Sequence, residues 1–153
     1  MPRILVDADA CPVKEEIYRV ARRLAVPVVV VANSRMRTPV AAAIELVVVA
    51  SGQLDDVDDW IAERAGPEDI VVSADIRLAA RCLAAGAQVL APEGRPFTDE
   101  SIGSALATRE LMAGLREQGA LSGGPPPFAP RDRSRFLHAL DEAVRQALQR
   151  ELP

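Results

Sequence analysis

Aromatic residues, cysteine and histidine are scarce in this 153-residue chain: aromatic residues make up 3% of it, and it has 2 cysteines and 1 histidine. Two cysteines cannot form a disulfide framework, and these two lack the spacing of a zinc site, so we expect reduced thiols. A single histidine, His138, gives little support to a Ser-His-Asp catalytic site. The core must therefore consist mainly of valine, alanine, leucine and isoleucine.

Long apolar runs and an excess of positive charge are also missing. No hydrophobic run approaches the roughly 20 residues of a membrane-spanning helix, and the N-terminus lacks the pattern of an export signal. We therefore expect no membrane association and a cytoplasmic location. The net charge of −4 argues against a protein that coats nucleic acid by charge alone. Glycine-rich phosphate-binding and dinucleotide-binding fingerprints are absent as well.

Short apolar runs alternate with helical patterns over most of the chain. The apolar runs predict strands over residues 3–7, 28–32, 45–50, 69–74 and 88–91. The amphipathic patterns between them predict helices over residues 13–25, 55–65 and 76–85. Such alternation with short links predicts a mainly parallel sheet of about five strands in a three-layer, Rossmann-like α/β fold.

Two further helices are predicted after this core, over residues 98–118 and about 131–150, with a Gly-Pro-rich loop between them. Phe136, Leu140 and Val144 belong to an apolar stripe on the last helix, which must pack against another part of the protein. We expect a single domain overall, with an α/β core over residues 1–97 and a C-terminal helical extension over residues 98–153 packed on it.

Aspartates follow three of the predicted strands. They are Asp7 and Asp9 after the first strand, Asp55, Asp56, Asp58 and Asp59 after the third, and Asp75 after the fourth. Because the carboxyl ends of parallel strands line one crevice, these carboxylates are expected to gather there. They would repel one another and lose hydration unless a cation compensated them. Oxygen-only ligands favour Mg²⁺ or Mn²⁺.

The aspartates differ in how well their positions suit a metal ligand. Asp7 is the best candidate, because it ends an apolar strand at the floor of the crevice. Asp9 would bind the metal through water or cap the following helix. Asp58 or Asp55 is favoured within the acidic run, and Asp75 would face Asp7 across neighbouring strands. Each has an ordinary alternative, since aspartate is a favoured helix N-cap and acidic residues stabilise the first turn of a helix.

Polar and basic residues near the same edge are candidates for binding a phosphate. Asn33 and Arg35 follow the second strand, and an arginine can hold a phosphate through two hydrogen bonds. Ser73 offers a hydroxyl, and Lys14 could approach the crevice. The alternative for Arg35 and Lys14 is an ordinary solvated surface side chain.

Six segments of the chain are similar to those of a known protein family. They are Val6 to Lys14, the Val-Val-Val-Ala-Asn that ends at Asn33, Asp55 to Ile61, Ser73 to Ala79, Gly123 to Pro125 and Asp132 to Phe136. Together, and in this order, they resemble the bacterial YaiI/YqxD family, also called UPF0178, along nearly the whole chain. That family is thought to be related to PIN-like domains. The resemblance therefore implies a PIN-like, metal-dependent nuclease fold with acidic residues at the edge of the sheet.

The resemblance also implies roles for individual residues. By position, Asp7 would match the first PIN aspartate and Asp75 the one after the later strand, with Asp58 or Asp59 as the helical acid. The candidates for a fourth acid are Glu93 and Asp99.

We therefore expect a phosphodiesterase or ribonuclease, a hydrolase that depends on Mg²⁺ or Mn²⁺, with Asp7, Asp58 and Asp75 holding the metal. The phosphate of RNA would be positioned by Arg35, Ser73 and Arg133. One alternative is a protein that binds RNA or a nucleotide without cleaving it. Another is a small-molecule phosphatase with Asp7 as nucleophile and Asp9 as acid.

Overall fold

The apolar runs of the sequence form strands and the amphipathic patterns form helices in the computed structural model, which describes residues 1–9, 11–41, 43–49, 56–117 and 128–152. The strands are β1 (Ile4–Asp7), β2 (Val28–Ala32), β3 (Ile44–Val48), β4 (Ile70–Val72) and β5 (Gln88–Leu90). The helices are α1 (Lys14–Leu24), α2 (Asp56–Arg64), α3 (Ile76–Ala84), α4 (Asp99–Glu117) and α5 (Pro130–Arg150).

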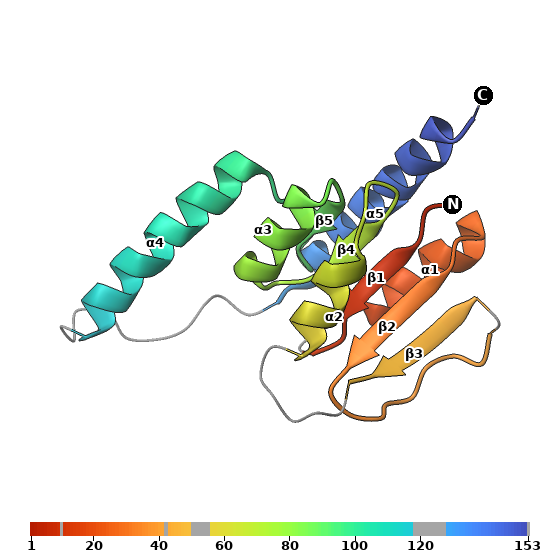
Figure 1. Cartoon of the computed structure of the whole chain (residues 1–153), viewed down its shortest axis with the longest axis horizontal. Coiled ribbons are helices and arrows are strands. Elements are labelled where there is room, and N and C mark those ends of the chain that lie inside the picture. Colours follow the sequence, from red (N-terminus) through yellow and green to blue (C-terminus); the bar gives the residue numbers. More distant parts are fainter. Residues whose placement is uncertain (10, 42, 50–55, 118–127, 153) are drawn as a thin grey trace.

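These strands form one parallel sheet in the order β3-β2-β1-β4-β5 (Figure 1). The predicted α/β fold with about five mainly parallel strands is thus confirmed. The chain builds outward from β1 to β3 and then crosses back to place β4 on the other side of β1. Open α/β sheets bind ligands outside the carboxyl ends of their strands, at the point where the direction of winding changes. In this sheet that point lies between β1 and β4.

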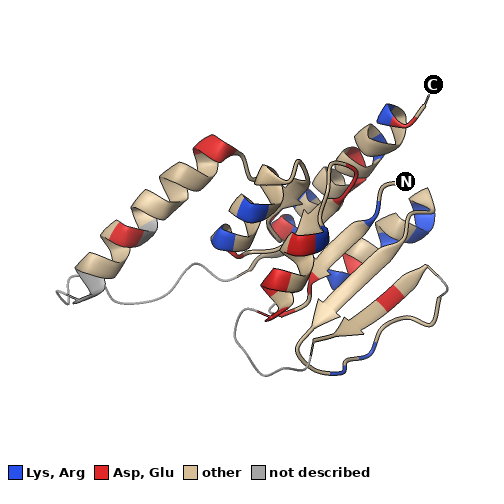
Figure 2. Ribbon diagram, viewed as in Figure 1, with Lys and Arg blue, Asp and Glu red and all other residues tan. Residues whose placement is uncertain are grey.

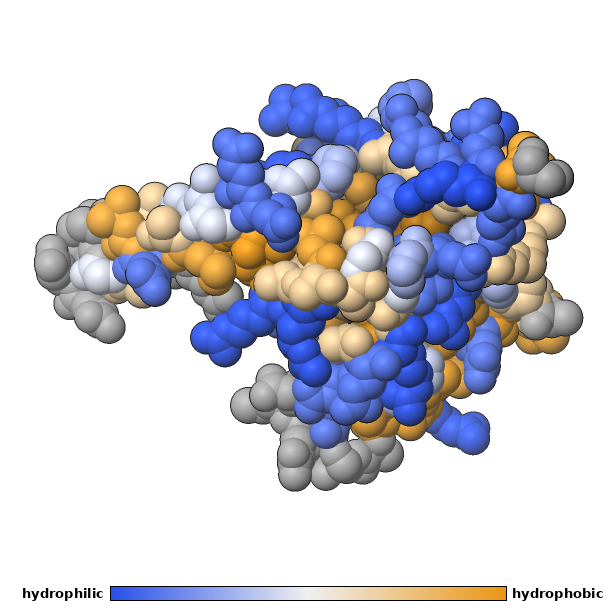
Figure 3. All heavy atoms as spheres, turned by 45° about the horizontal axis from the view of Figure 1, so that its top comes forward, coloured by the Kyte–Doolittle hydropathy of each residue, from blue (hydrophilic) through white to orange (hydrophobic). Residues whose placement is uncertain are grey.

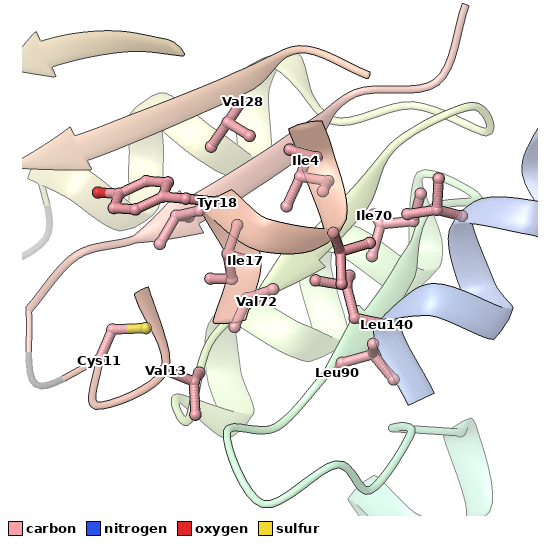
Figure 4. Close-up of a cluster of buried hydrophobic side chains, with 14 of the residues drawn as sticks. Ile4, Cys11, Val13, Ile17, Tyr18, Val28, Ile70, Val72, Leu90 and Leu140 are labelled. Carbon is pink, nitrogen blue, oxygen red and sulfur yellow. The ribbon is translucent and has the colours of Figure 1, made fainter. Parts of the chain in front are cut away.

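Alternate strand residues supply two hydrophobic layers, one on each face of the sheet. Ile4 and Val6 of β1 belong to the layer that α1 and α5 cover, whereas Leu5 belongs to the layer that α2 and α3 cover. Figure 4 shows the first of these layers, to which Ile17 of α1 and Leu140 of α5 contribute. Because successive side chains of a strand point to opposite faces, the fold has three layers: helices, sheet and helices.

The apolar stripe of α5 packs against α1 and the sheet. Phe136, Leu140 and Val144 are fully buried in the same cluster as residues of α1 and β1. The C-terminal helix is therefore part of the hydrophobic core. Although α4 and α5 are long, no helix within the described ranges has both the length and the apolar character needed to cross a membrane.

Helix α4 contacts α3 and then extends away from the sheet (Figure 1). Thr98 is its N-cap. The backbone N–H of Thr98 donates to Ser101 Oγ at 2.8 Å, and that of Ser101 donates to Thr98 Oγ1 at 3.0 Å. Leu106 and Leu111 are exposed on this helix, and Figure 3 shows hydrophobic side chains on the projecting arm. Helix α4 therefore stands beside the sheet instead of covering it.

The turn after β5 depends on a glycine that lies against α5. Gly94 has a φ of +90°, and a Cβ added there would lie 2.7 Å from the carbonyl carbon of Arg135 and 2.8 Å from the nitrogen of Phe136. Both the backbone conformation and the contact oppose a side chain. Gly94→Ala is therefore expected to lower the free energy of unfolding by at least about 2 kcal/mol, measured by urea denaturation.

Gly103 provides the matched control for this substitution. It lies on the exposed surface of α4, where an added Cβ would meet nothing within 4 Å. Gly103→Ala is expected to leave the stability unchanged or to raise it by up to about 1 kcal/mol, since alanine favours helices. Equal effects of the two substitutions would contradict the packing of the turn against α5.

Candidate functional site

The pairing of β1 with β4 brings Asp7 next to Ser73. Val6 is the partner of Val72, so Asp7 and Ser73 occupy the next positions on adjacent strands. The Ser73 hydroxyl donates to Asp7 Oδ2 at 2.8 Å and accepts from the backbone N–H of Asp75 at 3.0 Å. Ser73 is only 2% exposed. It therefore links the carboxyl ends of the two central strands at the switch point of the sheet.

The pairing of β1 with β2 places Asp9 next to Asn33 in the same way. Asp7 is the partner of Val31, and Asp9 and Asn33 each follow two residues later. Asn33 Nδ2 donates to Asp9 Oδ2 at 2.7 Å. The N-cap of α1 is Val13, without a side-chain cap, so the helix-cap alternative for Asp9 is wrong. Asn33 instead fixes the carboxylate of Asp9 at the sheet edge.

Asp75 has a structural role as well as a place at this edge. Its Oδ1 accepts hydrogen bonds from the backbone N–H groups of Arg77 at 2.8 Å and Leu78 at 3.2 Å, which confirms the N-cap alternative. The cap uses one carboxylate oxygen. The other, Oδ2, has no hydrogen-bond partner within the described residues. A capping role therefore does not prevent Asp75 from binding a ligand.

The acidic run of α2 divides between two environments. Asp58 lies at the same edge of the sheet as Asp7 and Asp75. Asp59 instead accepts a hydrogen bond from Arg81 at 2.7 Å. Asp55 lies outside the described residues. Figure 2 shows the acidic positions along α2. Among the described lining residues, Asp58 is the one that α2 contributes as a carboxylate to the edge between β1 and β4.

A cleft of about 1090 Å³ lies at this edge, between the ends of the strands and the first half of α4. It is markedly acidic. The carboxylates among its described lining residues are Asp7, Asp9, Asp58, Asp75 and Glu100, and the one basic side chain among them is Arg95. Carboxylates at this density favour the entry of a cation.

Asp7 is the carboxylate most affected by these surroundings. Burial raises the pKa of Asp7 above its ordinary value of 3.8, and the charges of Asp9 and Asp75 raise it further, while the Ser73 hydrogen bond lowers it. Asp7 is thus held firmly in one place where its charged form is disfavoured. Perturbed carboxyl groups in clefts are typical of functional sites.

The carboxylates fit one mode of metal binding and not another. In the part of the chain that the structure describes, no three Asp, Glu, His or Cys side chains come close enough together to hold one metal ion. A closed site of the structural zinc type is therefore not present there. Mg²⁺ is usually held by one or two carboxylates, with water and substrate phosphate completing its shell. The cleft fits an ion that is shared with a substrate in this way.

Several residues that the sequence suggested for phosphate binding do not line the cleft. Arg35 is exposed beyond the end of β2 and is not among the lining residues. Lys14 Nζ donates to the carbonyl of Cys11 at 3.0 Å. Arg133 donates to the carbonyl of Pro12 and pairs with the carboxylate of Glu16. Arg133 therefore ties the start of α5 to the start of α1.

Other residues line the cleft without having been expected there. Arg95 does so, while its guanidinium pairs with Glu93 at 3.1 Å. Glu100, not Glu93 or Asp99, is the additional acid in the lining. Four hydroxyls of the first half of α4 complete the wall, and they belong to Thr98, Ser101, Ser104 and Thr108. They are spaced three and four residues apart along the sequence, and this spacing indicates that they lie on one face of the helix.

The chain is similar to a family described as "Uncharacterized BCR, YaiI/YqxD family", whose profile matches residues 5–146. A UPF0178 protein of Rhodopseudomonas palustris (strain HaA2) is 59% identical over 148 residues, which cover 97% of this chain and 90% of that protein. A UPF0178 protein of Sphingopyxis alaskensis is 62% identical over 144 residues, covering 94% and 93%. No solved structure matches the chain significantly. The matched range includes every residue of the cleft.

Asp7→Asn is expected to make the metal-free protein more stable at neutral pH. Asparagine keeps the shape and can accept the Ser73 hydrogen bond, but it removes a buried charge. Because the pKa of Asp7 is raised, the folded state binds the proton more tightly than the unfolded state, and wild-type stability falls as the pH rises from 3.8 through the raised pKa. The advantage of the variant should therefore disappear below pH 3.8.

Urea denaturation of both proteins across this pH range, with chelator present, is the measurement. Ser73→Ala serves as the comparison, because it removes a hydrogen bond that favours the charged form of Asp7 and is expected to lower stability. A loss of stability in Asp7→Asn at neutral pH would show that Asp7 is mainly a structural residue.

Proposed function

The chain belongs to the YaiI/YqxD (UPF0178) family, and we propose that its acidic cleft is the active site of a phosphodiesterase that cleaves RNA with the help of Mg²⁺ or Mn²⁺. Asp7 carries the proposal. This carboxylate is oriented by Ser73 at the switch point of the sheet, and both burial and neighbouring carboxylates disfavour its charge. A divalent cation would relieve that cost.

The carboxylates of the cleft are the groups that would hold the ion. Asp7, Asp9, Asp58 and Asp75 all line it. One or two of them would bind the ion at a time, and a phosphate oxygen and water would supply the remaining ligands. When bound, the ion supplies positive charge and lowers the pKa of water at the reacting phosphate.

The surrounding residues orient these carboxylates and the phosphate. Asp7 accepts a hydrogen bond from the Ser73 hydroxyl and one from the backbone of Asp9, so its position is fixed before a ligand binds. Asn33 holds Asp9 in the same way. Arg95, across the cleft, is the described lining residue that can neutralise a phosphate oxygen.

Two arguments favour RNA over a small phosphate ester. The resemblance to PIN-like domains implies a nuclease, and the cleft is open and larger than one nucleotide requires. The phosphatase alternative, with Asp7 as nucleophile, has less support because no lysine is among the described lining residues. Binding of RNA without cleavage is favoured by one observation, the lack of a three-carboxylate group within the described residues.

Calorimetric titration of Mn²⁺ and Mg²⁺ into the wild type is expected to show saturable binding that Asp7→Asn loses. Asp58→Asn should weaken binding, because Asp58 lines the cleft. Asp59→Asn, its neighbour in the same helical turn, should not, because Asp59 pairs with Arg81 instead. The rate of cleavage of a labelled single-stranded RNA should be affected in the same way by the three substitutions. In Asp7→Asn this rate should fall at least about a hundredfold.

Each outcome separates the candidate functions. Metal binding that depends on Asp7, without any cleavage of RNA, would favour the binding protein over the enzyme. A phosphoaspartate trapped at Asp7 would favour the phosphatase. Absence of metal binding by the wild type, even with an oligonucleotide present, would overturn the proposal.

A further inference from the structure

We infer that one wall of the cleft binds the ribose–phosphate backbone of RNA over several nucleotides, so that the substrate is a polynucleotide strand and not a mononucleotide or dinucleotide. This wall, called the α4 wall below, consists of Arg95, Thr98, Ser101, Ser104 and Thr108. The inference rests on the function proposed for the cleft and extends it to residues outside the acidic cluster.

The two sides of the cleft differ in chemistry. The side formed by β1, α2 and the start of α3 supplies four carboxylates, whereas the side of the α4 wall supplies four hydroxyls, one guanidinium and a single carboxylate, that of Glu100. Hydroxyls of serine and threonine and the guanidinium of arginine are common hydrogen-bond donors to nucleic-acid phosphates. The α4 wall can therefore contact a backbone that the carboxylate side repels.

The hydroxyls of the α4 wall are not all engaged in holding the protein together. Thr98 and Ser101 cap α4 through their reciprocal hydrogen bonds. Ser104 and Thr108 are exposed, and their hydroxyls have no hydrogen-bond partner within the described residues. They lie one helical turn apart, so they point in the same direction. No hydrogen bond to a described residue explains why both positions carry a hydroxyl.

The length of the wall indicates the size of the ligand. The α4 wall runs along the helix from Thr98 to Thr108, which corresponds to roughly 15 Å at the rise of an α-helix. A stacked strand advances about 3.4 Å per nucleotide. Several nucleotides are therefore needed to cover the wall, and a dinucleotide would reach only part of it.

The charge of the wall predicts how binding responds to salt. Arg95 is the one cation among the described lining residues, and its partner Glu93 lies outside the lining. Binding of a single strand through one cation gives a slope of log K against log salt of about −0.7. Glu100 lies in the same lining and opposes the phosphates, so Glu100→Gln is expected to tighten binding.

Fluorescence anisotropy with labelled uridine oligonucleotides tests the inference directly. Binding is measured in Asp7→Asn, which is expected not to cleave the probe. An octanucleotide should bind at least about tenfold more tightly than a dinucleotide. The double variant Ser104→Ala with Thr108→Ala should weaken octanucleotide binding about tenfold and change dinucleotide binding less than about twofold. Arg95→Gln should also weaken octanucleotide binding about tenfold.

The controls separate binding from folding. Arg131→Gln removes an exposed arginine from α5, away from the lining, and should leave binding unchanged. Thr108→Glu places a good helix former at an exposed helical position, so the variant should fold and its charge should abolish octanucleotide binding. Arg95→Gln should also bring the salt slope from about −0.7 close to zero, which a merely structural role would not do.

The outcomes distinguish this inference from the proposed activity. Equal affinity for the dinucleotide and the octanucleotide, or wall variants that bind like Arg131→Gln, would overturn the α4 wall even if the wild type cleaves RNA in an Asp7-dependent manner. Octanucleotide binding that depends on the wall, in a wild type that cleaves no RNA, would support the wall and overturn the enzyme.

Discussion

The pairing of β1 with its two neighbours sets the positions of Asp7 and Ser73, and of Asp9 and Asn33, at the carboxyl ends of the strands. A shift of one residue in a strand moves all of its side chains to the opposite face. Such a shift would move Leu5 into the layer that α1 and α5 cover, and Ile4 and Val6 into the opposite layer, so that neither set would fit its neighbours. Each buried aliphatic side chain stabilises the fold by about 1.5 to 3 kcal/mol. Mispacking several such side chains would cost more than holding one disfavoured carboxylate, so the core enforces the placement of Asp7.

Asp75 shows that a structural role of a carboxylate leaves room for a chemical one. Asp75 caps α3 with one oxygen and leaves the other at the cleft. Ser73 accepts from the backbone of Asp75 and donates to Asp7, so the cap and the buried carboxylate share one hydrogen-bonded connection. A helix cap and a ligand are thus not competing interpretations of an aspartate that follows a parallel strand. One carboxylate has room for both when only one of its oxygens is needed for the helix.

Local patterns predict the floor of the cleft well and its far wall poorly. Asp7 and Asp75 follow apolar runs, and the rule that parallel strands end at one edge is enough to bring them together. No such rule predicts that the arginine lining the cleft is Arg95 and not Arg35. Arg95 reaches the cleft because the turn after β5 is closed by a hydrogen bond from Ala91 to its carbonyl and because Gly94 lies against α5. That contact joins residues about forty positions apart, and no local pattern shows it.

The same distinction applies to α4. Its helical pattern and its N-cap are visible in the sequence, because both depend on neighbouring residues. The direction of α4 depends on its contacts with α3. These contacts also decide that its hydroxyls lie across the cleft from the acidic side chains. The spacing of Ser101, Ser104 and Thr108 shows that they share a face, but only the fold shows what that face lies opposite.

The two sides of the cleft also differ in how firmly they are held. The carboxylate side grows out of the central strands, whose residues are fully buried on both faces, whereas α4 contacts α3 and then leaves the body of the protein. Segments with few packing contacts open and adjust at lower free-energy cost than core strands do. Groups that act on a reacting bond must be held to within about 0.5 Å, while contacts to a phosphate backbone carry no sequence information and tolerate small displacements. A rigid acidic floor beside an adjustable α4 wall therefore matches the separate demands that the proposed function makes, which are to cleave a strand and to hold it.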